Sequence, residues 1–223
     1  MNSHFLTKIE IDHETAHKAG LRDSYTWHQK TWQAFPNRDG QSRDFLTRLD
    51  EIAGGFRLLV LSPIEAVRPD WCPNAAWHSK PVSESFFSHK TYCFSLLANP
   101  TKKIRSNKKG ELLKNSRRVP LSKREELLGW LQRKGEQHGF TLDPEKTRTV
   151  PRPRQAFIKK GIAGLHSATE FIGTIEVTNL QTFRLAVCTG IGSAKAFGFG
   201  MLCLAPLNLS SKIQPTPSDG NYP

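Results

Sequence analysis

Residues 171–190 carry the sequence FIGTIEVTNLQTFRLAVCTG, which decides the fold of the second half of the chain. Apolar and polar side chains alternate strictly over residues 171–178, the pattern of a strand that is buried on one face. Leu180–Thr189 has the composition of a helix, and Gly190 follows where glycine commonly ends helices. Residues 199–204 are expected to form a final strand. This stretch therefore predicts a strand–helix–strand unit.

The residues before this unit extend the same alternation. Thr91–Ala98 (TYCFSLLA) predicts a strand that ends before an Asn-Pro pair. Residues 122–137 predict a helix that begins with a capping box of Ser122 and Glu125 and ends before a glycine. Residues 155–159 predict a further strand. The second half therefore has the order β-α-β-β-α-β, which is that of a ferredoxin-like domain.

The first half shows the beginning of the same order. Phe5–Asp12 and Gly55–Ser62 predict strands, and residues 24–35 (SYTWHQKTWQAF) predict the helix between them. Residues 70–90 are expected to be irregular because prolines interrupt them. We therefore expect an α+β fold of two tandem ferredoxin-like (RRM-like) β-α-β-β-α-β domains.

The expected domain limits follow from these elements. Residues 1–90 form the first domain, and residues 91–207 form the second, which also carries basic RNA-binding insertions and a glycine-rich loop. Residues 208–223 (NLSSKIQPTPSDGNYP) are polar and proline-rich, so we expect a disordered tail.

The sequence predicts neither secretion nor a membrane partner. Its first residues lack a basic region followed by an apolar region, and no apolar run approaches the roughly 18 residues of a membrane span. The four cysteines form no CxxC pair, so we expect buried thiols rather than a disulfide or zinc site. They are Cys72, Cys93, Cys188 and Cys203. Together these features predict a cytoplasmic protein.

The positive charge of the chain is concentrated in one region. Residues 102–160 hold 18 Lys or Arg and 6 Asp or Glu, a net charge of +12 that equals the net charge of the whole chain. A dense basic region of this kind favours a polyanionic partner, because each phosphate that it neutralises releases counterions. The alternative is a solvated basic surface or a flexible basic loop. We interpret the concentration as a nucleic-acid interface.

One face of the helix at 24–35 is a candidate catalytic site. Tyr25, His28, Trp32 and Phe35 follow one another at spacings that place them in one stripe. Such a stripe usually packs in the core, and that alternative stays open. However, a phenol and an imidazole one turn apart can act on the same phosphate. Histidine titrates near neutral pH and can take the proton of an RNA 2′-hydroxyl, so this chemistry needs no metal and no cofactor.

The glycine-rich segment GIGSAKAFGFG at 190–200 is a second candidate site. Its glycines allow backbone N–H groups to approach a phosphate, and Lys195 adds a positive charge. The alternative is a helix C-cap followed by an edge strand that glycine weakens. The segment is not a Walker loop, because it follows a helix and contains no Gly-Lys-Ser/Thr.

Four groups of residues occur in order along the chain. They are YTWHQ at 25–29 with Trp32 and FPNR at 35–38; LANPTK at 97–102; RVPL at 118–121 with WLQRK at 130–134; and GIGSAK at 190–195 with GFG at 198–200 and LAPL at 204–207. In this combination the sequence resembles the CasE family, the CRISPR repeat-processing endoribonucleases of the type I-E Cascade complex. The resemblance extends from residue 5 to residue 207.

The resemblance implies two ferredoxin-like domains and metal-independent cleavage of precursor CRISPR RNA at the 3′ base of the repeat hairpin. It also implies that the product stays bound within Cascade, so that the hairpin RNA and other Cascade subunits are the partners. The family's catalytic histidine falls on His28, its helper tyrosine on Tyr25 and its glycine-rich loop on 190–200. Residues 149–161 fall where the family has a basic hairpin, although their sequence departs from the family pattern.

The sequence therefore predicts an RNA hairpin endoribonuclease in which the 2′-hydroxyl attacks and leaves a 2′,3′-cyclic phosphate and a 5′-hydroxyl. His28 and Tyr25 are its expected catalytic residues. The expected RNA-binding residues are Lys102, Lys103, Arg105, Arg117, Arg118, Arg152, Arg154, Lys159, Lys160, Gly190, Gly192, Lys195, Gly198 and Gly200. Two alternatives remain open: a non-catalytic scaffold that binds the hairpin, and a metal-dependent nuclease.

Overall fold

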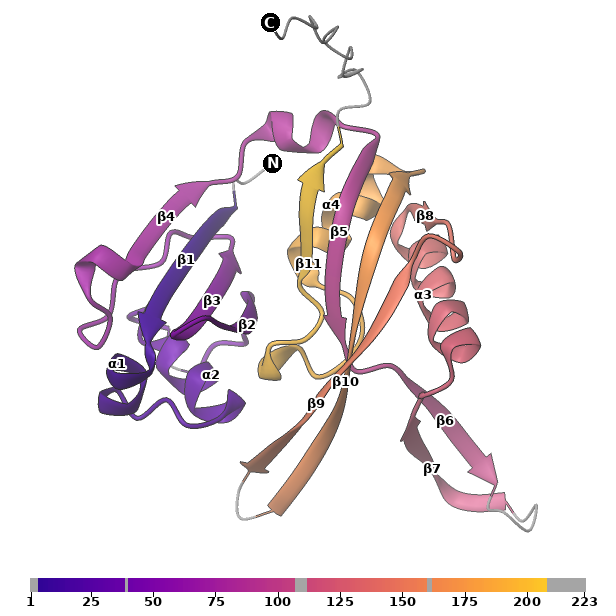
Figure 1. Cartoon of the computed structure of the whole chain (residues 1–223), viewed down its shortest axis with the longest axis horizontal. Helices are drawn as coiled ribbons and strands as arrows, with labels where there is room; N and C mark the ends of the chain where they lie inside the picture. The colour runs from indigo at the N-terminus through magenta and orange to yellow at the C-terminus, as the bar shows by residue number, and fades with distance from the viewer. Residues whose placement is uncertain (1–3, 39, 107–111, 160–161, 208–223) are drawn as a thin grey trace, which may run out of the picture.

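The computed structural model describes residues 4–38, 40–106, 112–159 and 162–207 (Figure 1). Within these ranges, the side chains of residues 113–117, 157–159 and 162–163 lie outside the description. The described strands gather in a four-stranded sheet, a five-stranded sheet and a two-stranded hairpin.

The first sheet has ferredoxin-like strand order, β2-β3-β1-β4, with all neighbours antiparallel. Its strands are β1 (Phe5–Asp12), β2 (Leu46–Ile52), β3 (Gly55–Ser62) and β4 (Trp77–Pro81). The helices α1 (His13–Lys18) and α2 (Ser24–Trp32) connect β1 to β2. The 3-10 turn η1 (Asn74–Ala76) precedes β4.

The second sheet repeats this order as β11-β5-β10-β8. Its strands are β5 (Thr91–Ala98), β8 (Phe140–Leu142), β10 (Ile162–Val177) and β11 (Leu202–Pro206). The helices α3 (Arg124–His138) and α4 (Leu180–Thr189) contact each other and lie on the same side of this sheet (Figure 1). Two further 3-10 turns complete the described elements: η2 (Glu84–Ser88) before β5, and η3 (Lys195–Phe197) between α4 and β11.

Two hairpins extend from the second sheet. The strand β6 (Thr101–Ser106) pairs with β7 (Leu112–Pro120), and β9 (Arg148–Lys159) pairs with residues 162–172 of β10. Both hairpins project from the same end of the molecule (Figure 1). The basic region of the sequence at 102–160 therefore includes nearly all of the β6–β7 hairpin and β9, one strand of the other hairpin.

The two sheets pack against each other through shared apolar contacts. One core cluster contains Trp27, Phe45 and Leu58 of the N-terminal half. The larger cluster centres on the second sheet, but it also contains Leu46 and Leu61 from β2 and β3. Burial of apolar side chains, the main favourable term in folding, therefore connects the two halves of the chain.

A buried ion pair also joins the two sheets. Arg48 of β2 donates from Nη2 to Oε1 of Glu170 on β10 at 2.6 Å, and their side chains are 7% and 5% exposed. Ser95 and Arg152 also donate to this carboxylate. Burial by itself would raise the pKa of Glu170, but the hydrogen bonds from Ser95, Arg48 and Arg152 outweigh it and lower the pKa to about 2. The charged pair thus holds β2 against β5 and β10.

Several predicted elements are confirmed with the limits expected. Phe5–Asp12, Gly55–Ser62 and Thr91–Ala98 are strands, and Leu180–Thr189 is a helix followed by Gly190. These segments have clear periodicity and a turn residue at their ends, so local sequence was sufficient to place them. The predicted strands at 155–159 and 171–178 are parts of the longer β9 and β10.

Other predicted boundaries are wrong for local reasons. The helix α2 ends at Trp32 and not at Phe35, because residues 33–35 form a tighter turn in which the Phe35 amide bonds the Trp32 carbonyl at 2.9 Å. The capping box of Ser122 and Glu125 does not form: α3 begins after Lys123, which makes no side-chain cap. The final strand begins at Leu202, since residues 198 and 200 are glycines with left-handed backbone, at φ 82° and 87°.

The sequence also failed to predict α1, β2, β4 and the β6–β7 hairpin. Residues 70–90 are not irregular throughout, because β4 lies on the sheet edge, where Pro81 needs no partner for a missing N–H. Of the cysteines expected to be buried, Cys72 is buried but Cys93 is exposed, because it lies on the outward face of β5. All four are free thiols. The predicted tail, 208–223, lies outside the described residues.

Candidate active site and nucleic-acid interface

The helix α2 is positioned by its cap and its buried face. The Asp23 carboxylate accepts from the Thr26 amide at 2.7 Å, and the Thr26 hydroxyl accepts from the Asp23 amide at 3.0 Å. This capping box starts the helix at Ser24. Trp27 and Thr31 are buried and direct this face toward the first sheet.

The predicted stripe of α2 does not behave as one core face. Tyr25, His28 and Trp32 are only partly buried. Phe35, beyond the end of the helix, is 3% exposed and stacks on Phe45 with ring centroids 4.7 Å apart. The stripe therefore has a buried end, while its other three members border open space.

That open space is a pocket of about 310 Å³ between α2 and η3, which we call the histidine pocket. It is lined by Tyr25, His28, Gln29, Trp32, Ala196 and Phe197. The glycine-rich loop thus forms one wall and the candidate catalytic helix the other, although more than 150 residues of sequence separate them.

His28 is held by its aromatic neighbours. The Trp32 indole Nε1 donates to Nε2 of His28 at 3.3 Å, and the Phe45 ring lies 6.0 Å from the imidazole. Because an indole N–H can only donate, Nε2 of His28 is the acceptor in this contact. The phenol oxygen of Tyr25 accepts from Gln29 at 3.0 Å. The imidazole of His28 and the phenol of Tyr25 thus line one pocket, and both are groups that can take part in proton transfer.

The glycines of the 190–200 loop allow it to pack closely against both halves. A Cβ at Gly190, where φ is 77°, would lie 2.8 Å from the Leu46 side chain of β2. A Cβ at Gly192, where φ is 87°, would lie 3.3 Å from the Trp130 ring of α3. Both the backbone conformation and the space thus require glycine at these positions.

A second pocket of about 420 Å³ lies where this loop meets α3 and the β6–β7 hairpin, and we call it the basic pocket. Its lining residues are Asn99, Thr101, Lys103, Arg118, Trp130, Lys134, His138, Thr189, Gly190, Gly192, Ser193 and Lys195. Five of the predicted RNA-binding residues converge here: Lys103, Arg118, Gly190, Gly192 and Lys195.

The cations of the basic pocket influence one another. Burial lowers the pKa of Lys195, and the nearby Arg43 and Lys134 lower it further. Burial also lowers the pKa of His138, to which Lys134 and Lys195 add repulsion. The Lys195 ammonium donates to the Thr189 carbonyl at 2.7 Å, which holds the side chain at the pocket wall.

The other predicted RNA-binding residues lie elsewhere. Lys102 pairs with Glu126 of α3 at 2.6 Å, and Arg152 pairs with Glu170. Arg105 and Arg154 are exposed on β6 and β9, on the two hairpins. Gly198 and Gly200 belong to the loop but line neither pocket. The side chains of Arg117 and Lys159, and the whole of Lys160, lie outside the described residues.

Sequence reasoning missed the contribution of α3 to the basic pocket. Trp130, Lys134 and His138 recur every four residues, so they share one helix face. That spacing was visible in the sequence, but nothing local indicated that the glycine-rich loop covers this face. Arg43, which donates to the Lys195 carbonyl at 3.2 Å, was missed because it comes from the other half of the chain.

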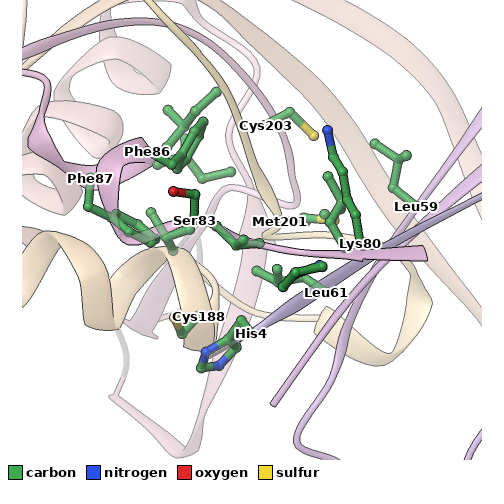
Figure 2. A pocket seen from close by; sticks show the side chains of 16 residues that line it. His4, Leu59, Leu61, Lys80, Ser83, Phe86, Phe87, Cys188, Met201 and Cys203 are labelled. Carbon is green, nitrogen blue, oxygen red and sulfur yellow. The ribbon is translucent and has the colours of Figure 1, made fainter. Parts of the chain in front are cut away.

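A third pocket, of about 390 Å³, differs in chemistry. Figure 2 shows Leu59 and Leu61 of β3 facing Met201 and Cys203, with Phe86 and Phe87 of η2 nearby. This lining is mainly apolar, and it suits packing between the halves rather than contact with a phosphate.

Two kinds of feature, a membrane-spanning helix and a metal-ligating cluster, are absent from the described residues. No helix among them is long and apolar enough to cross a membrane. No group of three or more His, Cys, Asp or Glu side chains in that part of the chain could hold a metal ion.

Two ferredoxin-like units with a histidine pocket and a basic pocket on one glycine-rich loop define a class of α+β nucleic-acid-binding proteins. A family model described as "CRISPR associated protein" matches residues 4–206. The "CRISPR system Cascade subunit CasE" of Escherichia coli K12 is 32% identical over 206 residues, covering 91% of this chain and 100% of the relative. The chain therefore belongs to the CasE family of CRISPR-associated proteins.

Further relatives and solved structures agree. The "CRISPR-associated endoribonuclease Cse3" of Thermus thermophilus is 25% identical over 218 residues, covering 91% of this chain and 100% of the relative. The crystal structure of Cas6e from E. coli K-12 matches with a TM-score of 0.68 and 29% identity, over 91% of this chain and 100% of that one. The structure of T. thermophilus Cse3 bound to an RNA representing a pre-cleavage complex matches with a TM-score of 0.69 and 25% identity. The match covers 92% of this chain and 100% of that one. The predicted family and fold class are confirmed.

Proposed function

We propose that this protein is the CRISPR RNA-processing endoribonuclease of its Cascade complex. It binds the repeat hairpin in precursor CRISPR RNA, cuts the strand at the 3′ base of the hairpin and stays bound to the mature guide RNA. Its relatives are named as a Cascade subunit and an endoribonuclease, and Cse3 has been solved with RNA. The observation that carries the proposal is the histidine pocket, where His28, held by Trp32, borders the same loop that lines the basic pocket.

The proposed reaction uses the RNA's own nucleophile. The 2′-oxygen upstream of the scissile bond attacks the phosphorus as its proton leaves, the bond to the 5′-oxygen breaks, and that oxygen gains a proton. The products are a 2′,3′-cyclic phosphate and a 5′-hydroxyl. His28 moves a proton as general base or general acid, and Tyr25 orients or stabilises the reacting phosphate. Cations stabilise the negative charge that develops on the phosphate oxygens.

The proposed site needs neither a metal nor a cofactor. Histidine titrates near neutral pH, and general acid–base help of this kind contributes about 10²–10⁴-fold. We also infer that the protein works in the cytoplasm, and that residues 1–90 and 91–207 are its two domains. The division agrees with the described sheets, which use residues 5–81 and 91–206.

A second candidate function is a non-catalytic scaffold that binds the hairpin. The contacts of His28 with Trp32 and Phe45 favour it, because an imidazole in an aromatic cluster can serve packing alone.

The test is a reaction of the purified protein with a repeat hairpin in EDTA. We expect one cut and a product that ends in a 2′,3′-cyclic phosphate. A hairpin with a single 2′-deoxy substitution at the cut should bind and stay intact. RNA that stays uncut both with and without EDTA would support the scaffold, and cleavage that occurs only without EDTA would indicate a metal-dependent nuclease. Cleavage of the deoxy hairpin would contradict the proposed nucleophile.

A further inference from the structure

The basic pocket concentrates positive charge without acidic partners. Lys103, Arg118, Lys134 and Lys195 line it together with His138, and no Asp or Glu is among its described lining residues. In the described part of the chain, none of these four cations forms an ion pair with a carboxylate. Lys102, one residue from Lys103, does pair with an acid, so the lack of partners is a property of the pocket.

The pocket brings like charges together at a structural cost. Lys103 of β6 stands directly opposite Arg118 of β7, and like charges in such a pair are destabilising. Lys134 and His138 are one turn apart on α3, so Lys134 disfavours a charge on the imidazole. Lys195 comes from the loop to the same space. Three independent elements thus direct cations to one place, an arrangement that an anion in the pocket would stabilise.

The walls of the basic pocket include buried residues and hydrogen-bonded side chains. Trp130 is 8% exposed and Asn99 is 9% exposed, so both are part of the packed structure. Lys134 is held by a hydrogen bond of 2.8 Å to Gln137, and Lys195 by its bond to Thr189. The cations are therefore partly ordered before a ligand arrives, which reduces the entropy lost on binding.

We propose that the basic pocket binds one phosphate group of the RNA backbone, at a site separate from the phosphate that is cut beside His28, with Lys134, His138 and Lys195 as its ligands. This proposal rests on the proposed function, because it assumes that RNA is the partner. It adds α3 to the RNA-binding surface. The chemistry that recognises the ligand is that of a phosphate, which could come from RNA or from inorganic phosphate.

A phosphate bound in the basic pocket should favour the protonated form of His138. In the free protein, burial together with Lys134 on its own helix and Lys195 on the loop lowers the pKa of His138 and favours its neutral form. Lys103 and Arg118 of the hairpin are the other cations that line this pocket. A bound phosphate reverses the sign of the local field and favours the imidazolium. RNA affinity should therefore rise as pH falls through the bound-state pKa of His138 and level off below its free-state pKa.

The first experiment measures binding of the uncleavable 2′-deoxy hairpin by fluorescence anisotropy between pH 5.5 and 8.5 (about the range in which histidine titrates). We expect Lys134→Gln to weaken binding about tenfold, the typical loss of one charged hydrogen bond. It should also lower the slope of log affinity against log salt by about 1. His138→Gln should remove part of the pH dependence.

Matched control variants test whether the loss of binding is specific to the basic pocket or follows the loss of any positive charge. Arg133→Gln removes one exposed charge next to Lys134 on α3, and His17→Gln removes an exposed histidine on α1. Both should bind as the wild type does. An equal loss with Arg133→Gln, or an unchanged pH dependence in His138→Gln, would overturn the proposal.

The second experiment identifies the source of the phosphate in the unmodified protein. NMR follows the His138 ring during titration with inorganic phosphate and, separately, with the deoxy hairpin. A shift with both probes assigns a general phosphate site, and a shift with RNA alone assigns a backbone phosphate; a ring that responds to neither contradicts the site. Separate readouts keep the two proposals apart: the basic pocket is tested by binding of the uncleavable hairpin to Lys134→Gln and His138→Gln, and the catalytic assignment by cleavage with His28→Ala. Cutting by His28→Ala would contradict the catalytic assignment and leave the binding results standing.

Discussion

The histidine pocket and the basic pocket meet at one turn of the chain but differ in character. Lys195 begins η3 and lines the basic pocket, whereas Ala196 and Phe197 complete the histidine pocket. The basic pocket collects cations from three elements, while the histidine pocket combines aromatic rings with a single imidazole. The difference predicts that RNA binding and proton transfer depend on separate side chains, the cations of the basic pocket and His28 of α2. Each should therefore be removable without the other.

The largest effect is expected from His28→Ala. It should lower the single-turnover rate of cleavage by about 10²–10⁴-fold, because the proton is no longer transferred by a positioned group. Binding of the hairpin should not change, since the cations of the basic pocket remain. Gel analysis of product against time measures the rate, and anisotropy measures binding. His17→Ala on α1 is the control, and full activity of His28→Ala would refute the assignment.

The buried pair of Arg48 and Glu170 joins the two sheets, so Glu170→Gln tests what holds the two halves of the chain, and with them the two pockets, in place. We expect the free energy of unfolding to fall by about 3 kcal/mol, because the buried Arg48 loses the Glu170 carboxylate and keeps Asp50, at 3.0 Å, as a partner. Urea denaturation measures the change. Glu176→Gln is the matched control on the same strand; its side chain is 53% exposed, so about 1 kcal/mol or less is expected.

The same pair gives a pH dependence of defined sign. The pKa of Glu170 is about 2 in the folded protein and 4.5 in a free glutamate. Its charged form therefore stabilises the fold above about pH 4.5, and this contribution is lost as pH falls toward 2. Denaturation at a series of pH values should show wild type and Glu170→Gln converging in that window. Parallel curves would show that the carboxylate does not couple to folding.

A smaller effect is expected from Trp32→Phe, which keeps an aromatic ring but removes the N–H that bonds His28. One neutral hydrogen bond contributes about 0.5–1.5 kcal/mol, so cleavage should slow by about two- to tenfold. KM should stay the same, because the basic pocket is untouched. Single-turnover kinetics over a range of protein concentrations measures both the saturated rate and KM. A changed KM with an unchanged rate would mean that Trp32 contacts RNA instead of positioning His28.

The smallest effect is expected from Arg154→Gln on the exposed part of β9. We expect binding to weaken about equally for all hairpin sequences and the salt slope to fall by about 0.7–0.9. The cleavage rate at saturation should not change. Anisotropy at several salt concentrations checks the slope. A salt slope equal to that of the wild type would remove Arg154 from the RNA-binding surface.

The parts of the fold that could be predicted are those with strong local signals. The strand Gly55–Ser62 and the helix Leu180–Thr189 have clear periodicity and glycine or proline at their ends. By contrast, β2 carries charged residues that look exposed in sequence. Besides Asp50 on its own strand, its Arg48 pairs with Glu170, which lies 122 residues away on β10. No local pattern contains that information.

His28, Tyr25 and the glycine-rich loop became candidates from the sequence because residue type and spacing express their chemistry, and their roles stay predictions. The concentration of charge at 102–160 likewise indicated an anionic partner. The arrangement of these parts could not be found there. Packing of the loop over α3 brought Lys134 and His138 into the basic pocket, and packing of α2 against η3 opened the histidine pocket. Chemical character belongs to each side chain, whereas a pocket depends on contacts between residues far apart in the chain, which only the folded core brings together.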